Sequence, residues 1–371
     1  MKNRTMFMVV ALLAVLAVGG YAAHAQAVLT LPSGNVSIGV GAYGELGNCN
    51  GANCNSGGVA TGTPALPAGS NVAGGPYGIY LASQNADGVA PGCFCEGWGA
   101  AYNGSVQGNS SNDNGGNTNI TPGSFTTNAL PNGYGTTATS VVTIGSLQVT
   151  QAFAPAVNTP GAGGGTSNWL FQDTVTLDNT SDAAMTNVEY ARSTDWDIPP
   201  TEFNEIETLG GWGATALTYS VNNGFCNDNP LTLASSCVVI DTTAGSAWID
   251  TNFTQNGVAD QGSSFLFNLG SLGADDSATF NIFYGAADNN ADAFTALGDV
   301  GAEVYVLGYS NNGNDGANLD SGTWMFGFSG VGGTPLPPPS GVTPEPSSLV
   351  LFGTSMLGLA GMVRLRRGKK A

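Results

Sequence analysis

The sequence predicts an all-β protein, a disulfide-stapled β-sandwich of jelly-roll or immunoglobulin-like topology. In its second half, apolar and polar residues alternate over short runs, as they do on half-buried strands. Phe280, Ile282 and Tyr284, for example, would share one face of such a strand. Turns rich in Gly, Asn and Asp separate these runs at fairly regular spacing. Apolar residues make up 42% of the chain and charged residues 9%, a composition that can form a core rather than a disordered chain.

Strand signals are weak before residue 138 and clear after it. Asp292 to Leu297 is the one helix that we expect in the body. Residues 103–121 are of low complexity, and we expect an exposed loop there because the segment is too polar to bury. The predicted strands are 36–40, 77–81, 140–153, 169–177, 188–192, 214–221, 237–241, 247–253, 264–269, 278–284, 303–309 and 324–328.

The chain divides into five parts. We expect a signal peptide at 1–25, a region of short strands rich in Gly, Asn, Ser and Thr at 26–137, the sandwich at 138–329, a stiff Pro/Gly spacer at 330–342 and a C-terminal signal at 343–371.

The N-terminal segment has the three parts of a secretory signal peptide. Lys2 and Arg4 form a positive start, residues 6–18 form an apolar stretch, and Ala23-His24-Ala25 is a small-residue cleavage site. Cleavage after Ala25 would leave Gln26 as the first mature residue.

The C-terminal segment combines Pro344-Glu345-Pro346, an apolar run at 347–363 and a basic tail. A run of about 17 residues is at the lower limit for a transmembrane helix. The tail marks the cytoplasmic side; its cations are Arg364, Arg366, Arg367, Lys369 and Lys370. An ordinary tail anchor is the alternative interpretation.

These three parts, in this order, resemble the PEP-CTERM sorting signal of Gram-negative bacteria. The resemblance implies a destination and no activity: the protein would be exported, held in the inner membrane by residues 347–363, and cut near Pro344-Glu345-Pro346 by an exosortase. It would then reach the cell surface or the medium. Residues 93–99, 187–205 and 277–309 are also similar to stretches of secreted members of unassigned function.

Charge and histidine content exclude several functions. Between Gln26 and Thr343 the chain has 25 acidic residues and one cation, Arg192, a net charge of −24. Such a body repels nucleic acid, since phosphate binding needs Lys and Arg. The one histidine, His24, lies in the signal peptide, so the mature protein has neither a histidine base nor a histidine metal ligand.

An even number of cysteines in an exported chain indicates disulfides. Cys226 and Cys237 would close a short loop of their own, and the other four would staple the N-terminal half; they are Cys49, Cys54, Cys93 and Cys95. Zinc is the competing interpretation. Cys93 and Cys95 have one residue between them, where zinc knuckles have two.

The densest group of candidate site residues follows Arg192. Asp195 and Asp197 would lie on one face of a strand, about 6 to 7 Å apart. Four interpretations stay open: an ion pair with Arg192, a calcium site with Glu202, solvated carboxylates, or an inverting glycosidase pair. Calcium is the one cofactor that this group suggests.

The sequence therefore predicts a non-enzymatic surface or matrix protein, with a structural or interaction role in an exopolysaccharide or biofilm. A carbohydrate-binding module is the alternative, because Trp212 lies between bare glycines and its indole would suit a sugar ring. A glycoside hydrolase acting through Asp195 and Asp197 is the third candidate.

Overall fold

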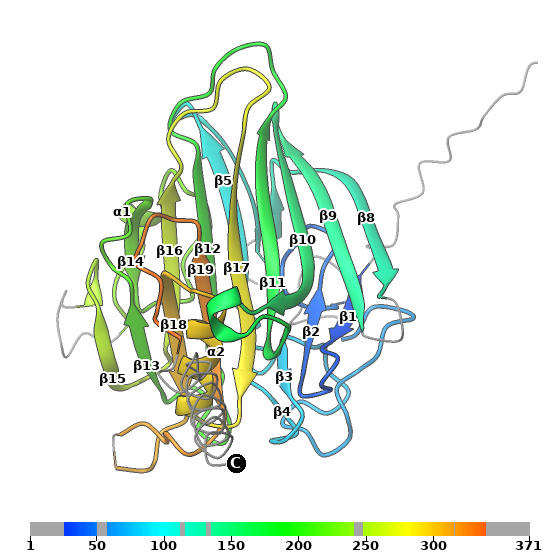
Figure 1. Cartoon of the computed structure of the whole chain (residues 1–371), viewed down its shortest axis with the longest axis vertical. Helices are drawn as coiled ribbons and strands as arrows, with labels where there is room; N and C mark the ends of the chain where they lie inside the picture. The colour runs from blue at the N-terminus through cyan, green and yellow to red at the C-terminus, as the bar shows by residue number, and fades with distance from the viewer. Residues whose placement is uncertain are drawn as a thin grey trace, which may run out of the picture.

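The computed structural model describes residues 26–49, 58–111, 116–130, 135–240, 248–314 and 316–338. The described chain is mostly β, in three antiparallel sheets (Figure 1). Both terminal signals predicted from the sequence, including the membrane run at 347–363, lie outside these residues. Within them, no helix is long and apolar enough to cross a membrane.

The smallest sheet is formed by the N-terminal strands in sequence order. Its strands are β1 (Ala27–Thr30), β2 (Val36–Val40), β3 (Ile79–Leu81) and β4 (Ala86–Asp87). The buried carboxylate of Asp87 accepts hydrogen bonds from the backbone N–H groups of Gly78, Ile79, Val89 and Ala90. This one side chain therefore holds the two ends of the β3–β4 segment together.

The second sheet has six strands and draws them from both halves of the chain. In spatial order they are β14 (Leu217–Val221), β16 (Gly262–Asn268), β12 (Glu189–Asp195), β5 (Glu96–Tyr102), β6 (Val106–Ser111) and β7 (Gly116–Thr118).

The third sheet has nine strands. In spatial order they are β15 (Phe253–Ala259), β13 (Glu205–Gly210), β18 (Val304–Tyr309), β19 (Thr323–Ser329), β17 (Ser277–Ala287), β11 (Thr166–Asn179), β10 (Leu147–Val157), β9 (Thr136–Ile144) and β8 (Thr121–Ala129).

The main core lies where the six-stranded and nine-stranded sheets face each other. Phe265 of β16 packs on Phe328 of β19 with ring centroids 5.0 Å apart, and Tyr190 of β12 packs on Phe280 of β17 at 5.1 Å. The predicted face of Phe280, Ile282 and Tyr284 is confirmed, because all three belong to this core. Side chains alternate along a strand, so Phe283 points the other way.

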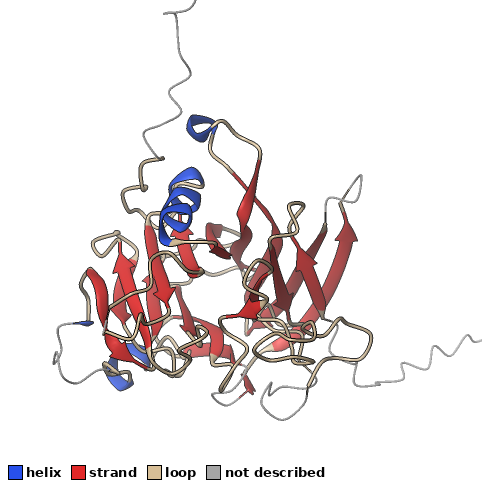
Figure 2. Cartoon of the chain, turned by 90° about the horizontal axis from the view of Figure 1, so that it is seen from below, coloured by secondary structure: helices blue, strands red, loops and turns tan. Residues whose placement is uncertain are grey.

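A second apolar cluster covers the outer face of the nine-stranded sheet. Helix α2 (Asn290–Asp299) lies on β11, β17 and β19 (Figure 1), and the helices are seen again in Figure 2. Its Leu297 is buried in one apolar cluster with Phe283 and Met325. The side chain of Asn289 caps the helix by accepting a hydrogen bond from Asp292 N at 3.0 Å. The predicted helix is therefore present and longer than expected, but α1 (Leu233–Ser236) and a 3₁₀ turn (Pro160–Ala162) are also present.

Several predictions of local structure are wrong. The low-complexity segment 103–121 contains β6 and β7, and Asn109, Ser110 and Ser111 are buried. Burial is possible because polar side chains find partners in the sheet, as Ser110 Oγ does with Asn117 Oδ1 at 2.7 Å. The run 140–153 is broken at Gly145, where β9 turns into β10. In the described parts of 237–241 and 247–253, strand begins only at Phe253.

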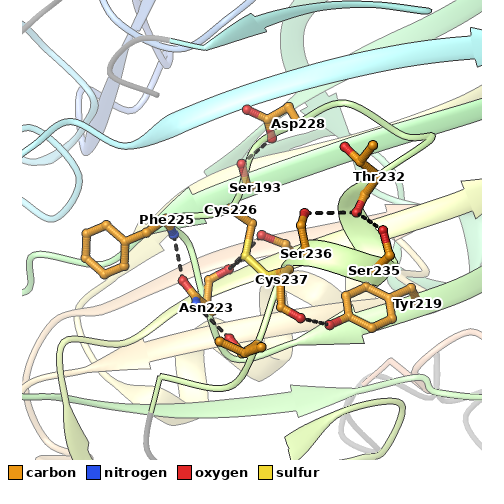
Figure 3. The surroundings of a disulfide bond; sticks show 12 residues. Ser193, Tyr219, Asn223, Phe225, Cys226, Asp228, Thr232, Ser235, Ser236 and Cys237 are labelled. Carbon is orange, nitrogen blue, oxygen red and sulfur yellow. Dashed lines mark hydrogen bonds between the residues drawn. A yellow bond between two sulfur atoms is a disulfide. The ribbon is translucent and has the colours of Figure 1, made fainter. Parts of the chain in front are cut away.

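The predicted pairing of Cys226 with Cys237 is confirmed (Figure 3). This disulfide ties the end of α1 to the segment that follows β14, and Tyr219 Oη of β14 donates a hydrogen bond to Cys237 O at 2.9 Å. Cys93 is bonded to Cys95, and Cys49 is also disulfide-bonded. Cys54 lies outside the described residues.

Candidate cation site

An acidic site lies where the chain passes twice between the two large sheets. The first passage leaves β12 at Asp195 and enters β13 at Glu205; the second leaves β15 at Ala259 and enters β16 at Gly262. The two passages are joined by backbone hydrogen bonds, since Trp196 N donates to Gln261 O at 2.9 Å. Carboxylates that are far apart in the sequence therefore meet where these two passages run side by side.

Glycine makes this close approach possible. Gly262 pairs with Asp195, and a Cβ at Gly262 would lie 2.5 Å from Thr194 O and 2.8 Å from the Cα of Gly224. Any larger residue at position 262 would push the three chain segments apart. The position of Asp195 against the turn that carries Asp260 thus depends on this glycine.

Three aspartates converge at the site. Asp195, Asp197 and Asp260 each place a carboxylate oxygen within 4.8 Å of the other two. Asp195 is 2% exposed and Asp197 is fully buried, while Asp260 is half-buried on the solvent side. We call Asp195, Asp197 and Asp260 the aspartate triad.

The triad has almost no hydrogen-bond donors. Oδ1 of Asp195, both oxygens of Asp197 and Oδ1 of Asp260 have no hydrogen-bond partner among the described residues. Arg192, the only Lys or Arg between residues 26 and 338, is occupied elsewhere. Buried carboxylates are normally paired, so these oxygens lack the positive partner that their burial calls for.

Two neighbouring glutamates differ from the triad because they are hydrogen-bonded. Glu205 Oε1 accepts from the backbone of Phe203 at 2.6 Å and of Ile198 at 3.2 Å, and its Oε2 accepts from Gln261 N at 3.4 Å. Glu207 accepts hydrogen bonds from Trp196 Nε1 at 3.3 Å and from the Ser263 hydroxyl. Both glutamates therefore hold the two chain passages in place; each accepts at least two hydrogen bonds, whereas neither oxygen of Asp197 accepts any from the described residues.

Burial and mutual repulsion disfavour the charged form of these acids. Burial, with Asp260, Glu202 and Asp87 adding repulsion, raises the pKa of Asp197 to about 8. Burial and the charge of Asp197 raise the pKa of Asp195 well above its ordinary value. Burial likewise raises the pKa of Glu205 to about 9. Without a cation, the site is thus destabilised by deprotonation.

The donor set is suited to a hard divalent cation. Ca²⁺ binds six to eight oxygens and tolerates irregular geometry, so three carboxylates with carbonyl and water oxygens would satisfy it. The triad presents only oxygen ligands, which favour Ca²⁺ over the thiophilic metals.

The geometry argues against the predicted glycosidase pair. An inverting pair needs carboxyl groups about 6.5 to 9.5 Å apart, with room for a water and a sugar between them. Asp195 and Asp197 bring oxygens within 4.8 Å of each other, and both side chains are buried.

The predicted ion pair of Arg192 with Asp195 or Asp197 is wrong. Arg192 pairs with Glu96, and both side chains are fully buried. Successive residues of a strand face opposite sides, so Arg192 points into the core between the sheets while Asp195 points the other way.

Sequence reasoning found two members of the triad and missed the third. Glu202, the predicted third ligand, is not in the group, although its charge contributes to the raised pKa of Asp197. Asp260 takes its place. The residues Asp260-Gln261-Gly262 are typical of a turn, but no local pattern indicates that this turn would reach Asp195.

Three of the six tryptophans are buried, and Trp169, Trp212 and Trp248 are half-buried. Trp98, Trp196 and Trp324 are buried in the core, and their indole N–H groups are hydrogen-bonded. Trp212 is half-buried and lines a cavity of about 250 Å³ together with Glu303. Trp212 is the one of the three half-buried tryptophans that lines a cavity described here, so it is the best placed for a ligand.

Comparison with known proteins found no protein-family model and no curated protein that matches the chain.

Proposed function

We propose that this is an exported surface or extracellular-matrix protein whose β fold is stabilised by Ca²⁺ bound to Asp195, Asp197 and Asp260. One observation carries the cation site: three converging carboxylates, two of them buried, have oxygens without hydrogen-bond donors. The role is structural, because the triad joins the two chain passages that link the sheets. The two facing sheets would then form a β-sandwich with a cation at one edge.

Calcium titration of the mature protein, by calorimetry and thermal unfolding, tests this role. At a hundredfold excess over the dissociation constant, Ca²⁺ would stabilise the fold by about 2.7 kcal/mol, a rise in Tm of about 5 °C. The variant Asp197→Asn should lose this response and be more stable than wild type without the ion, since it removes repulsion. The matched control is Asp182→Asn, at an exposed position.

A melting temperature that is the same in Ca²⁺ and in chelator would contradict the cation site. So would an Asp197→Asn variant that binds calcium as tightly as the control.

The surface location is supported by the terminal sequence segments. We propose delivery through an N-terminal signal peptide and processing by an exosortase at Pro344-Glu345-Pro346, with the inner membrane as an intermediate anchor. Mass spectrometry of protein recovered from cell surface and medium should give a chain that begins at Gln26 and ends near Pro346. A chain that keeps residues 347–371 and stays with the membrane would contradict this processing.

Carbohydrate binding is the second candidate, supported by the cavity at Trp212. The indole and the carboxylate of Glu303 are the stacking and polar groups that sugar recognition uses. An exopolysaccharide would be the partner. The body should be retained on the organism's own polysaccharide, and Trp212→Ala should reduce the retention; a body that passes unretained rules out this role.

A further inference from the structure

The Cys93–Cys95 disulfide borders the aspartate triad. Cys93 Sγ lies 3.5 Å from Oδ2 of Asp195, and Cys93, Cys95 and Asp195 each place a ligand atom within 4.8 Å of the other two. Asp195 therefore belongs to two groups, the triad on one side and the cysteine pair on the other. While the sulfurs are bonded to each other, neither offers a thiolate to a metal.

Stability alone gives little reason for this disulfide. In the chain-entropy model a cross-link stabilises more when it closes a longer loop. Cys93 and Cys95 are two positions apart, whereas Cys226 and Cys237 are eleven apart. The first bond therefore constrains the unfolded chain much less than the second.

The backbone keeps the two cysteines beside Asp195 independently of the sulfur–sulfur bond. Asp195 N donates to Cys95 O at 2.8 Å, and Glu96 N donates to Phe94 O at 3.0 Å. Phe94, between the cysteines, has a left-handed φ of 48° that is rare for a bulky residue, and its ring is buried in the main core. The ring and the two hydrogen bonds would hold this conformation after reduction.

The distances fit a zinc site. With Zn–S of about 2.3 Å and Zn–O of about 2.1 Å, a tetrahedral site separates a sulfur from a carboxylate oxygen by about 3.6 Å. The observed distance from Cys93 Sγ to Asp195 Oδ2 is 3.5 Å. The two sulfurs would have to part to about 3.8 Å, which reduction permits.

A reductant can reach the bond from solvent. Cys93 is half-buried and follows Gly92, which is exposed, while Cys95 is buried. Attack of an external thiolate on the Cys93 sulfur is therefore the accessible route of exchange.

We propose that reduction of the Cys93–Cys95 disulfide creates a second metal site, in which both sulfurs and Asp195 bind a thiophilic divalent cation such as Zn²⁺. A dithiol supplies two electrons and two protons and leaves as its own disulfide, and the two cysteines become thiols. Metal binding then releases both thiol protons, and a water fills the fourth position.

The new site would compete with the proposed calcium site, and this one consequence rests on the proposed function. Ca²⁺ prefers carboxylates and Zn²⁺ prefers thiolates, but both need Asp195. Zinc bound with the cysteines through Oδ2 of Asp195 would lie close to calcium at the triad, so the two dications would repel each other and zinc would weaken calcium binding. The reduction state of one disulfide would decide which cation this edge of the fold holds.

Cobalt is the probe, because a Co²⁺–thiolate bond gives a charge-transfer absorption that carboxylates do not give. The mature protein is reduced with a dithiol, freed of it without air, and titrated with Co²⁺. Wild type should show this absorption, and Cys93→Ser/Cys95→Ser, treated identically, should lose it. The matched control, Cys226→Ser/Cys237→Ser, should keep it. Asp195→Asn should keep the absorption and lose affinity for Co²⁺, because it removes an anionic ligand and leaves both thiolates.

A measurement on wild type alone guards against a variant that fails to fold. Zn²⁺ should protect Cys93 and Cys95 of the reduced protein from alkylation, as peptide mass spectrometry would show. Equal alkylation with and without zinc, or equal cobalt absorption in wild type and Cys93→Ser/Cys95→Ser, would overturn the proposal. Calcium titration of the oxidised protein is scored separately, so either site can fail without the other.

Discussion

Arg192 of β12 and Glu96 of β5 form an ion pair in the core, and both side chains are fully buried. Arg192 also donates from Nη1 to Gln151 Oε1 at 3.1 Å, and its guanidinium lies 5.1 Å from the centroid of the Tyr284 ring. Arg192, the only Lys or Arg among the described residues, therefore neutralises a carboxylate between the sheets and none of the aspartate triad.

Replacing Arg192 with methionine should destabilise the fold by about 3 to 5 kcal/mol, because Glu96 would stay buried without its partner. The double variant Arg192→Met/Glu96→Gln should recover much of this loss, since the second change removes the unpaired charge. Urea denaturation of the three proteins measures both effects. A single variant as stable as wild type would show that the pair contributes nothing to stability.

Without a cation, stability should fall as pH rises from about 5 to about 9. Burial raises the pKa of Asp197 and of Asp173 to about 8 and that of Glu205 to about 9. Between the ordinary carboxyl range and these values, the folded protein binds more protons than the unfolded chain, so folding weakens as protons leave. Thermal unfolding in chelator should therefore give a higher Tm at pH 5 than at pH 8.

Calcium should act in the opposite sense, because it replaces the protons of the triad. Its stabilising effect should be larger at pH 8 than at pH 5, and Asp197→Asn should flatten the pH dependence in chelator. A Tm in chelator that rises between pH 5 and pH 8 would contradict the assignment of these carboxyls as protonated when buried.

The two disulfides should differ in their effect on stability. From loop length alone, removing the Cys226–Cys237 bond should cost about 3 kcal/mol and removing Cys93–Cys95 about 1.5 kcal/mol. Denaturation of the corresponding double serine variants compares them under identical conditions. A larger loss for Cys93→Ser/Cys95→Ser would mean that the shorter bond is chiefly structural.

The predictable part of the fold was the part with a local pattern. β17 was expected because Phe280, Ile282 and Tyr284 alternate with residues of the opposite face. β5 was missed because its glycines and alanines carry no alternation. Its strand is buried on both faces, and a Cβ at Gly97 or Gly99 would collide with Asp228. The need for those glycines arises from a residue that lies far along the chain.

At the candidate site, too, only neighbours in the sequence could be predicted to lie together. Asp195 and Asp197 are two positions apart, so their proximity could be predicted from the sequence alone. Asp260 joins them only because the β15–β16 turn crosses between the sheets beside the end of β12, and such pairing depends on the whole topology. The partner of Arg192 was mispredicted for a related reason: its nearest acids in sequence lie on the opposite face of the strand, and Glu96 comes from the neighbouring strand.

Glu205 offers a test of positioning at the proposed cation site, because its carboxylate contacts both chain passages and is not in the triad. Its carboxylate holds Ile198 and Phe203 on one passage and Gln261, next to Asp260, on the other. Glu205→Gln replaces one acceptor oxygen with an NH₂ group and so breaks part of this bridge. If calcium binds at the triad, its affinity should fall about tenfold, as it does when residues that orient the ligands of a metal site are changed. The matched control, Glu189→Gln on β12, should bind calcium as wild type does. If Glu205→Gln also kept full affinity, the triad would be preorganised by the backbone alone, with Gly262 and the Trp196–Gln261 hydrogen bond as its supports.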